Sequence, residues 1–430
     1  MFKNSLKFLV VLSCTLIFEC GAQTELRLSL DSARQYALDY NKHLENAGLA
    51  VDEARARLME TISKGLPQVN ASMDYSNFFA SSASLGAMPG FVIEFNPTSN
   101  LSVSVTQLVF SGSYIVGVQS AKLYKEVTET NREKSELDIR AQVTQAYYLS
   151  LISEKFKTVV EANLQNMRDL LEKTRVMVEF GMAEEVDHDQ LSVQTTMLAD
   201  AVRAAGRQVE LSLNMLRLQI GLPADVDIVL TDSMESILSG ANFRRSLSQT
   251  FSIQDNLDYR LMELQADLAA KHVQLERSAF LPTISGFYNY TEKLLKPEFD
   301  ITPKHVIGLQ ASIPIFSSWG RQSRVNQARM NVMIAENQKY LLSQQLLIQE
   351  KQLRYNLNTA IEQYESQRAN LEVAQRVYEN INNKYQQGML SSLDLTTANG
   401  NYLQAENSYI SSILQVMEAQ IALDKLLNVL

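Results

Sequence analysis

The chain has few residues that interrupt a helix. Its 430 positions include 8 Pro and 16 Gly, whereas average usage would give roughly 21 and 30. This composition argues against collagen-like, propeller and β-sandwich architectures and indicates a chain dominated by helix. A hydrophobic content of 46% is also too high for a disordered chain.

Cysteine is absent beyond the first 20 residues. Cys14 and Cys20 belong to an N-terminal stretch in which two lysines precede a short apolar run. This arrangement predicts a signal peptide over residues 1–22, followed by a mature chain without disulfides, as suits an oxidising compartment. The alternative is a lipoprotein acylated at Cys20, although Glu19 differs from the small residue usual at that place.

Several functional classes lack support. The formal charge of -9 argues against a basic face for nucleic acid. The sequence has no phosphate-binding glycine loop and no nucleophile elbow, and its four histidines are scattered rather than spaced as metal ligands. No apolar run after residue 23 is long enough for a transmembrane helix. We therefore expect no enzyme activity, no cofactor and no nucleic-acid partner.

The two halves of the chain resemble each other. Leu66–Val69 reappears as Leu281–Ile284, and at the same offset Asn41 falls on Asn256. Gly181 and Gly388 match at a similar offset, each followed six residues later by an aspartate. Matches that keep their order over the whole mature chain indicate an internal duplication.

The duplication predicts three parts after the signal peptide. They are a first repeat over residues 23–222, a junction over 223–250, and a second repeat over 251–430. We expect strands near 68–80 and 99–110 in the first repeat and near 283–295 and 304–315 in the second. The hairpin tips are expected near residues 181 and 388.

Long segments free of Gly and Pro predict long helices. Residues 118–180 and 321–387 contain neither residue, and helices of that length imply a coiled coil or a helical array. Near the C-terminus, large residues recur every seven positions from Leu395 to Leu430, with mostly small residues three positions later. This pattern favours knobs-into-holes packing, and we interpret it as packing alone.

The proline-bearing windows alternate instead with period two. Val69, Ala71, Met73 and Tyr75 are separated by polar residues, which predicts strands. Runs of about ten residues are long enough for tilted membrane strands. A soluble sheet with one wet face explains the same pattern equally well. Aromatic residues such as Tyr288 and Tyr290 fit either an interfacial girdle or ordinary sheet packing.

Four strands per chain cannot close a barrel by themselves. They leave two open edges, which a membrane does not tolerate. The long helices likewise carry apolar seams without a globular core. Both features predict a homo-oligomer.

With these features the sequence resembles the TolC-type outer-membrane efflux proteins over residues 25–430. The resemblance depends on the duplication, on Ser312–Phe316 opening a long helix, and on the tip motif from Tyr385 through Gly388 and Asp394 to Ala398. It implies a mainly α fold with membrane β: a trimeric α-barrel of long coiled-coil helices, and four strands per chain of a twelve-stranded transmembrane β-barrel.

The resemblance also implies a function. The trimer would be a passive exit channel for efflux or type I secretion, located in the outer membrane and extending into the periplasm. Its partners would be outer-membrane lipid, an inner-membrane transporter and a periplasmic adaptor protein. The alternative is a periplasmic adaptor or scaffold with long helical hairpins. The duplicated hairpins and the strand lengths favour the channel.

The resemblance places a gate at the hairpin tips. Gly181 and Gly388 would form the turns, Asp187 and Asp394 would lie near the constriction, and Tyr385 would bond toward Asp187 when the tip is shut. The family's arginine two residues after the second glycine is replaced by Leu390. The alternative is that both aspartates are ordinary solvated or helix-capping residues. A metal site from Asp187, His188 and Asp189 is disfavoured because adjacent helical residues do not converge.

Overall fold

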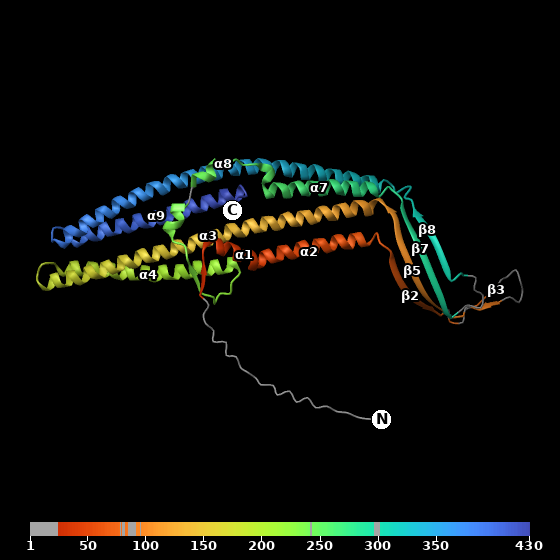
Figure 1. Cartoon of the computed structure of the whole chain (residues 1–430), viewed down its shortest axis with the longest axis horizontal. Coiled ribbons are helices and arrows are strands. Elements are labelled where there is room, and N and C mark those ends of the chain that lie inside the picture. The colour runs from red at the N-terminus through yellow and green to blue at the C-terminus, as the bar shows by residue number, and fades with distance from the viewer. Residues whose placement is uncertain are drawn as a thin grey trace, which may run out of the picture.

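The computed structural model describes residues 25–77, 79, 82–84, 92–94, 96–240, 243–295 and 302–430. The signal peptide predicted over residues 1–22 and the alternative acylation at Cys20 lie outside these residues. In the described part, long helices run side by side along most of the molecule, and a small sheet continues from one end of them (Figure 1). The predicted combination of long paired helices with four long strands is confirmed.

The helical elements follow the Gly- and Pro-poor segments. In chain order they are α1 (Leu30–Tyr40), α2 (Lys42–Ser63), α3 (Gly112–Glu179), α4 (Glu185–Ile220), α5 (Met234–Gly240), α6 (Phe243–Ser248), the 3-10 turn η1 (Ile253–Asp255), α7 (Leu257–Ser278), α8 (Gly320–Gln386) and α9 (Ser392–Leu426). None of these described helices is long and apolar enough to cross a membrane.

The strands form three separate sheets. In chain order they are β1 (Leu26–Leu28), β2 (Gln68–Ser76), β3 (Ser82–Ser84), β4 (Val92–Glu94), β5 (Thr98–Ser111), β6 (Ile228–Leu230), β7 (Thr283–Leu295) and β8 (His305–Ser312). The main sheet is antiparallel in the order β2-β5-β7-β8, so β5 of the first half pairs with β7 of the second. β3 and β4 form a short antiparallel pair between β2 and β5.

The main sheet has one apolar face and one polar face. On the apolar face Val69 lies opposite Val105, which lies opposite Tyr288, and Tyr288 lies opposite Ile307. On the polar face Ser72 lies opposite Ser102, whose hydroxyl is 3.3 Å from that of Thr291. The period-two sequence pattern therefore sorts side chains between two environments, because successive residues point to opposite faces.

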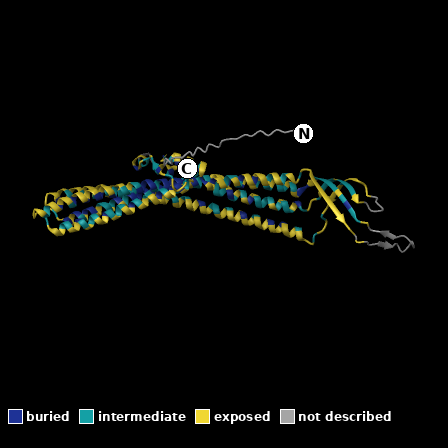
Figure 2. Cartoon of the chain, turned by 90° about the horizontal axis from the view of Figure 1, so that it is seen from below, coloured by how far each residue is buried: buried dark blue, intermediate teal, exposed yellow. Residues whose placement is uncertain are grey.

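The helices continue the order of the strands to which they connect. α2 leads into β2, β5 into α3, α7 into β7 and β8 into α8, and the helices pack in the matching order α2-α3-α7-α8. Beyond the middle of the molecule α3 pairs with α4, and α8 pairs with α9. Figure 2 shows buried residues gathered where the helices run side by side near the middle. In the main sheet the edge strands β2 and β8 are mostly exposed, and the inner strands β5 and β7 are mostly half-buried.

The heptad stripe of α9 is buried or half-buried, which agrees with its interpretation as packing. Leu395, Val416 and Leu423 have no exposed surface, and Ala398 and Ser412 of the small-residue track are also buried. Large residues on one track and small residues on the other let neighbouring helices approach closely along the whole length of α9.

A parallel pair of short strands packs against the middle of the long helices. β1 pairs with β6, and the buried Tyr147 of α3 contacts both the Leu28 carbonyl (3.0 Å) and Asp232 (2.8 Å) through its hydroxyl. The Leu30 backbone amide donates to the same Asp232 carboxylate, at 2.8 Å. Burial, and next the bond to Asp232, raise the pKa of Tyr147, so its hydroxyl keeps its proton at neutral pH.

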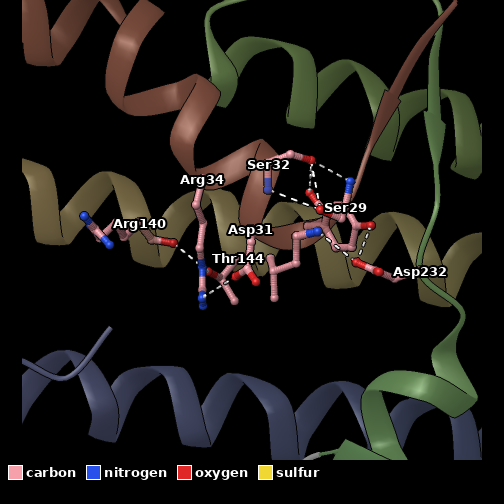
Figure 3. Close-up of polar contacts among 9 residues, drawn as sticks. Ser29, Asp31, Ser32, Arg34, Arg140, Thr144 and Asp232 are labelled. Atoms are coloured by element: carbon pink, nitrogen blue, oxygen red, sulfur yellow. Dashed lines mark hydrogen bonds and ion pairs between the residues drawn. The ribbon is translucent and has the colours of Figure 1, made fainter.

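A second polar contact ties α1 to α3. The Arg34 guanidinium donates to the Thr144 hydroxyl at 2.8 Å, and Thr144 in turn donates to the Arg140 carbonyl at 2.7 Å. Figure 3 shows this contact beside the Asp232 cluster, with side chains from segments far apart in the sequence converging on α3. The contacts hold the short β1–β6 pair and its flanking helix α1 against the long helices.

Candidate gate at the hairpin tips

The two hairpin tips have the same backbone geometry. Gly181 and Gly388 lie in the left-handed region, with φ of 71° and 72°. The residue after each glycine donates back into the helix: Met182 to the Met177 carbonyl at 2.7 Å, and Met389 to the Lys384 carbonyl at 3.0 Å. This is the Schellman ending, in which glycine is favoured because a Cβ is strained at positive φ.

Asp187 and Asp394 both cap the helix that follows the turn. Asp187 accepts from the Glu184 backbone amide at 3.2 Å, at the start of α4. Asp394 accepts from the Ser391 amide at 3.1 Å and from the Ser391 hydroxyl at 2.7 Å, at the start of α9. The Ser391 hydroxyl, and next its amide, lower the pKa of Asp394. Helix capping is thus a role that both aspartates have in this structure.

The two aspartates differ in what else they contact. Asp187 also receives a hydrogen bond from the hydroxyl of Ser392, a buried residue at the start of α9. The same hydroxyl lies 3.0 Å from Gln190 Oε1. Asp394 is exposed, and its described hydrogen bonds all involve Ser391. Asp187 therefore links the first hairpin to the second, whereas Asp394 presents its charge to the surroundings.

Tyr385 is buried between the hairpins. Its hydroxyl lies 2.9 Å from the Thr174 hydroxyl of α3, and its ring packs in a core with Leu191 and Leu395. Burial is the main reason that the pKa of Tyr385 is raised, and the Asp187 charge contributes to the same shift. The Asp187 charge therefore acts on the Tyr385 hydroxyl, but the hydrogen-bond partner of that hydroxyl is Thr174.

Sequence reasoning missed a third link between the hairpins. Asn163 of α3 and Asn399 of α9 are both buried, and their side-chain amides form a reciprocal pair with N–O distances of 2.9 Å and 3.4 Å. Asn399 follows the buried Ser392 by seven residues, so both lie on one heptad track. A polar residue recurring at one heptad position is the signal that would have found this pair.

The interface between the hairpins combines an apolar cluster with three polar links. Ser392–Asp187, Tyr385–Thr174 and Asn163–Asn399 all join the first hairpin to the second. Apolar heptad packing holds α8 against α9. A neutral hydrogen bond contributes about 0.5–1.5 kcal/mol and a bond to a charged group about 1.5–3 kcal/mol, so the three links together add a few kcal/mol to the contact between the hairpins.

The described residues contain no cluster of His, Cys, Asp or Glu that could hold a metal. His188 Nδ1 lies 3.7 Å from Asp189 Oδ1, whereas Asp187 faces Ser392. These three neighbouring side chains do not meet at one point.

A known family matches the second half of this chain. The sequence pattern described as "Outer membrane efflux protein" matches residues 252–429. The resemblance to the TolC-type efflux proteins is confirmed. A search of curated proteins finds no match for the chain.

Solved structures match the fold over nearly its whole length. CusC, whose structures are described as showing transmembrane channel formation, has a TM-score of 0.77 at 16% identity, over 93% of this chain and 91% of CusC. The CmeC outer membrane channel of Campylobacter jejuni has a TM-score of 0.74 at 17% identity, over 93% and 85% of the two chains. The outer membrane protein VceC of Vibrio cholerae has a TM-score of 0.74 at 17% identity, over 93% and 95%. The chain thus shares the fold of these outer membrane proteins.

Proposed function

We propose that three copies of this chain form an outer-membrane channel, a passive exit route from the periplasm for efflux or type I secretion. The observation that carries the proposal is the sheet with one apolar and one polar face, continuing directly from helices that are together much longer than the sheet. In a closed barrel the apolar face meets lipid and the polar face lines a water-filled pore. Chains with this fold include described channels.

The free edges of the protomer favour a closed ring. β2 and β8 are the edge strands of the sheet, and the helices connected to them, α2 and α8, are the outer helices of the same row. One edge of strands and helices therefore faces the opposite edge of the next copy. Such head-to-tail contacts generate rings when the rotation closes, and closure satisfies the edge strands. The family resemblance supplies the number three.

The exposed face of α8 supports this contact between neighbouring copies. Ile334, Leu341, Ile348 and Tyr355 recur every seven residues and are all exposed in the single chain. An apolar heptad stripe of this kind is normally covered by another helix, and we assign that role to α2 of the neighbouring copy together with α4, which lies end to end with α2. Leu49 and Met59 are exposed apolar residues of α2.

The gate lies at the hairpin tips, with Gly181 and Gly388 as turns. Asp394 contributes an exposed carboxylate, and three symmetry-related copies in a narrow pore attract cations and repel anions. Asp187 and Tyr385 act differently, because their partners Ser392 and Thr174 belong to the opposite hairpin. We infer that these two links stabilise the closed tip.

The proposed partners are an inner-membrane transporter and a periplasmic adaptor protein. A groove of about 370 Å³ lies between α3 and α8 near the tips, lined by charged and amide side chains such as Lys173, Gln375 and Glu379. Polar walls of this kind suit a reversible contact with a helical partner. Residues 1–22 serve as signal peptide, 23–222 and 251–430 as repeats, and 223–250 as the junction.

Membrane flotation tests the location. The full chain, expressed with its N-terminal segment, is expected to float with outer-membrane vesicles after alkaline washing. Recovery in the soluble periplasmic fraction would favour the alternative, an adaptor or scaffold. Purified protein in planar bilayers is expected to give discrete conductance steps, and cross-linking is expected to end at three subunits.

A pair of variants tests the proposed contact between neighbouring copies. Ile348→Glu places a charge on the apolar stripe of α8 and is expected to abolish the cross-linked trimer, because an unpaired buried charge is costly. Gln349→Glu adds the same charge at an exposed polar position of α8 that does not share a helix face with Ile348, and is expected to preserve it. Equal trimer yields from both variants would exclude this face from the interface.

A further inference from the structure

The polar face of the main sheet carries one aromatic side chain. Phe287 of β7 precedes Thr291 of the polar face by four residues, so alternation places it on the same face. It lies opposite Thr106 of β5 and Gly308 of β8. Within the four described strands of this sheet, every other aromatic residue falls on the apolar face. Phe287 is therefore an exception to the pattern that separates the two faces.

The Phe287 ring lies over the backbone of Gly308. A Cβ atom at position 308 would be only 2.6 Å from Phe287 Cζ, a distance that side chains do not tolerate. Glycine at this position thus gives the ring room to lie against β8. The side chain is half-buried, so part of the ring remains accessible from the polar face.

Two further apolar side chains lie diagonally beside the ring. Leu108 of β5 lies opposite Ser285, two residues before Phe287, and Val306 of β8 lies opposite Asn289, two residues after it. Diagonal neighbours on one face of an antiparallel sheet are about 7–8 Å apart, within reach of an aromatic side chain. We call Leu108, Phe287 and Val306 the lumen patch, because the polar face lines the proposed pore.

The surroundings of the lumen patch are polar but uncharged. Within the four strands, the nearest charged residues on this face are Asp74 and Lys293. Lys293 follows Phe287 by six residues, and Asp74 follows Gln68, at the level of Phe287, by the same number. Six residues correspond to about 20 Å along a strand. The patch is therefore suited to an apolar contact rather than to an ion.

We propose that the lumen patch binds aromatic groups of the molecules that pass through the channel. This inference rests on the proposed channel, in which three copies place three patches at one level of the strand barrel. A partly accessible ring favours a second ring in an offset or edge-to-face contact. Thr106 and Asn289, which flank Phe287 on the same face, offer hydrogen bonds to polar parts of the same molecule. The matching ligand is an amphiphile with an aromatic part.

A neighbouring copy does not cover the patch. Strand pairing at the β2 and β8 edges extends the sheet in its own plane, and it leaves the polar face open. The competing explanation is structural, because an aromatic side chain over a glycine also stabilises a strand. That explanation accounts for Phe287 over Gly308 but not for Leu108 and Val306 on the same diagonal.

A single thiol beside the patch tests the inference. The two cysteines of the chain lie in the predicted signal peptide, so Thr106→Cys gives the mature protein one thiol opposite Phe287. The purified trimer in detergent is treated with benzyl methanethiosulfonate or with butyl methanethiosulfonate, which reacts in the same way but has no ring. Phe287→Leu keeps an apolar side chain and removes the ring. We expect it to lower the ratio of the benzyl to the butyl rate constant by about two- to tenfold.

Three further variants accompany this measurement, each combined with Thr106→Cys. Phe287→Tyr keeps a ring and is expected to keep the ratio. Tyr288→Leu removes the neighbouring ring on the apolar face and is expected to leave the ratio unchanged. If Phe287→Leu yields no trimer, Val306→Ser at an exposed position of β8 tests the same patch. It is expected to lower the ratio by about twofold.

A permanently charged reagent separates this inference from the proposed function. In reconstituted vesicles, a methanethiosulfonate that carries a trimethylammonium group is expected to modify Thr106→Cys, on the polar face, and to leave Tyr288→Cys unmodified. If Thr106→Cys is unreactive, or Tyr288→Cys reacts equally fast, the channel proposal fails. If Thr106→Cys alone reacts but its preference for the benzyl reagent survives Phe287→Leu or Val306→Ser, the lumen patch is overturned and the channel stands. An equal loss of preference in Tyr288→Leu would also overturn the lumen patch.

Discussion

Asn41 joins α4 to α2 in the same way that Asn256 joins α9 to α7. Each side chain accepts hydrogen bonds from the first amides of one helix, those of His43 and Leu44 for Asn41. Its Nδ2 donates to the last turn of another helix, at 2.6 Å to the Gln219 carbonyl for Asn41 and 3.2 Å to the Leu426 carbonyl for Asn256. Each buried amide therefore connects two shorter helices end to end alongside a long one.

Removing the Asn41 side chain, which connects α4 to α2, is expected to destabilise the protein. Asn41→Ala loses the N-cap, typically about 1 kcal/mol, and leaves the Gln219 carbonyl without its donor. We expect the free energy of unfolding, measured by urea titration, to fall by about 1–3 kcal/mol.

Asn41→Asp keeps the acceptor but faces a carboxylate toward a carbonyl, so a similar loss is expected. The control is Asn46→Ala, at an exposed position of α2. A loss as large as that of Asn41→Ala would contradict the connecting role of Asn41.

The links between the hairpins are expected to control opening of the tip. Tyr385→Phe keeps the packed ring but removes the hydrogen bond to Thr174, and Ser392→Ala removes the donor to Asp187. Tyr385→Phe is expected to favour the open tip by about 0.5–1.5 kcal/mol, and Ser392→Ala, which removes a bond to a carboxylate, by about 1.5–3 kcal/mol. Single-channel recording would detect either change as a higher open probability.

The matched control for these links is Thr397→Ala. The Thr397 hydroxyl is exposed near the tip and bonds only within its own helix, to the Leu393 carbonyl at 2.7 Å. An open probability that rises equally for Thr397→Ala would mean that loss of a hydroxyl, rather than loss of a cross-link, is responsible.

Asp394 has a capping role and a proposed pore role, which substitutions can separate. Asp394→Asn removes the charge but keeps an oxygen for the Ser391 amide, whereas Asp394→Ala removes both. If the carboxylate lines the pore, both variants are expected to weaken block by multivalent cations, or to raise conductance, to a similar extent. Unchanged conductance and block in both variants, with the trimer intact, would leave Asp394 as a helix cap alone.

The stability due to the Asp394 charge depends on pH in a predictable direction. Because its pKa is lowered on folding, the contribution is fully present above the unfolded pKa near 3.8 and is lost as pH falls through the lower folded pKa. The difference in unfolding midpoint between wild type and Asp394→Asn should therefore persist at pH 7 and shrink below about pH 4. A difference that grows on acidification would contradict this assignment.

Glu406 is expected to show the opposite pH dependence. This residue of α9 is buried, and burial raises its pKa despite the bond from Tyr402 and the charge of Lys155. Its ionisation therefore opposes folding, and stability falls as pH rises from the unfolded pKa near 4.5 through the folded pKa. Glu406→Gln is expected to unfold at higher urea concentration than wild type at pH 7, with no difference near pH 4. Glu418→Gln, on the exposed face of α9, should match wild type at both pH values.

Much of the local structure could be predicted because it depends on short-range rules. Gly181 and Gly388 mark the tips because a left-handed residue ends a helix most easily as glycine. The stripe from Leu395 to Leu423 was identified as packing because heptad spacing places its members on one helix face. The alternation around Val69 assigned the strands because successive side chains point to opposite faces.

The partners of the site residues could not be predicted in the same way. The duplication matched Asn41 with Asn256, but the carbonyls that receive their amide protons lie about 170 residues or more away. Tyr385 was expected to bond toward Asp187, and in the structure its hydroxyl pairs with Thr174 while Asp187 pairs with Ser392. The partners come from helices distant in sequence, and no local pattern specifies which side chains meet.

By itself the sequence determined which segments are helix or strand, and it predicted the turns and an internal duplication, because these properties follow from backbone freedom and side-chain periodicity. Only the tertiary structure decided the sheet order, in which β5 of one half pairs with β7 of the other. It also decided the polar links between the hairpins and the contact of the Phe287 ring with Gly308. These properties depend on the packing of segments distant in sequence, where side-chain shape and unsatisfied polar groups select one arrangement among many that the local rules allow.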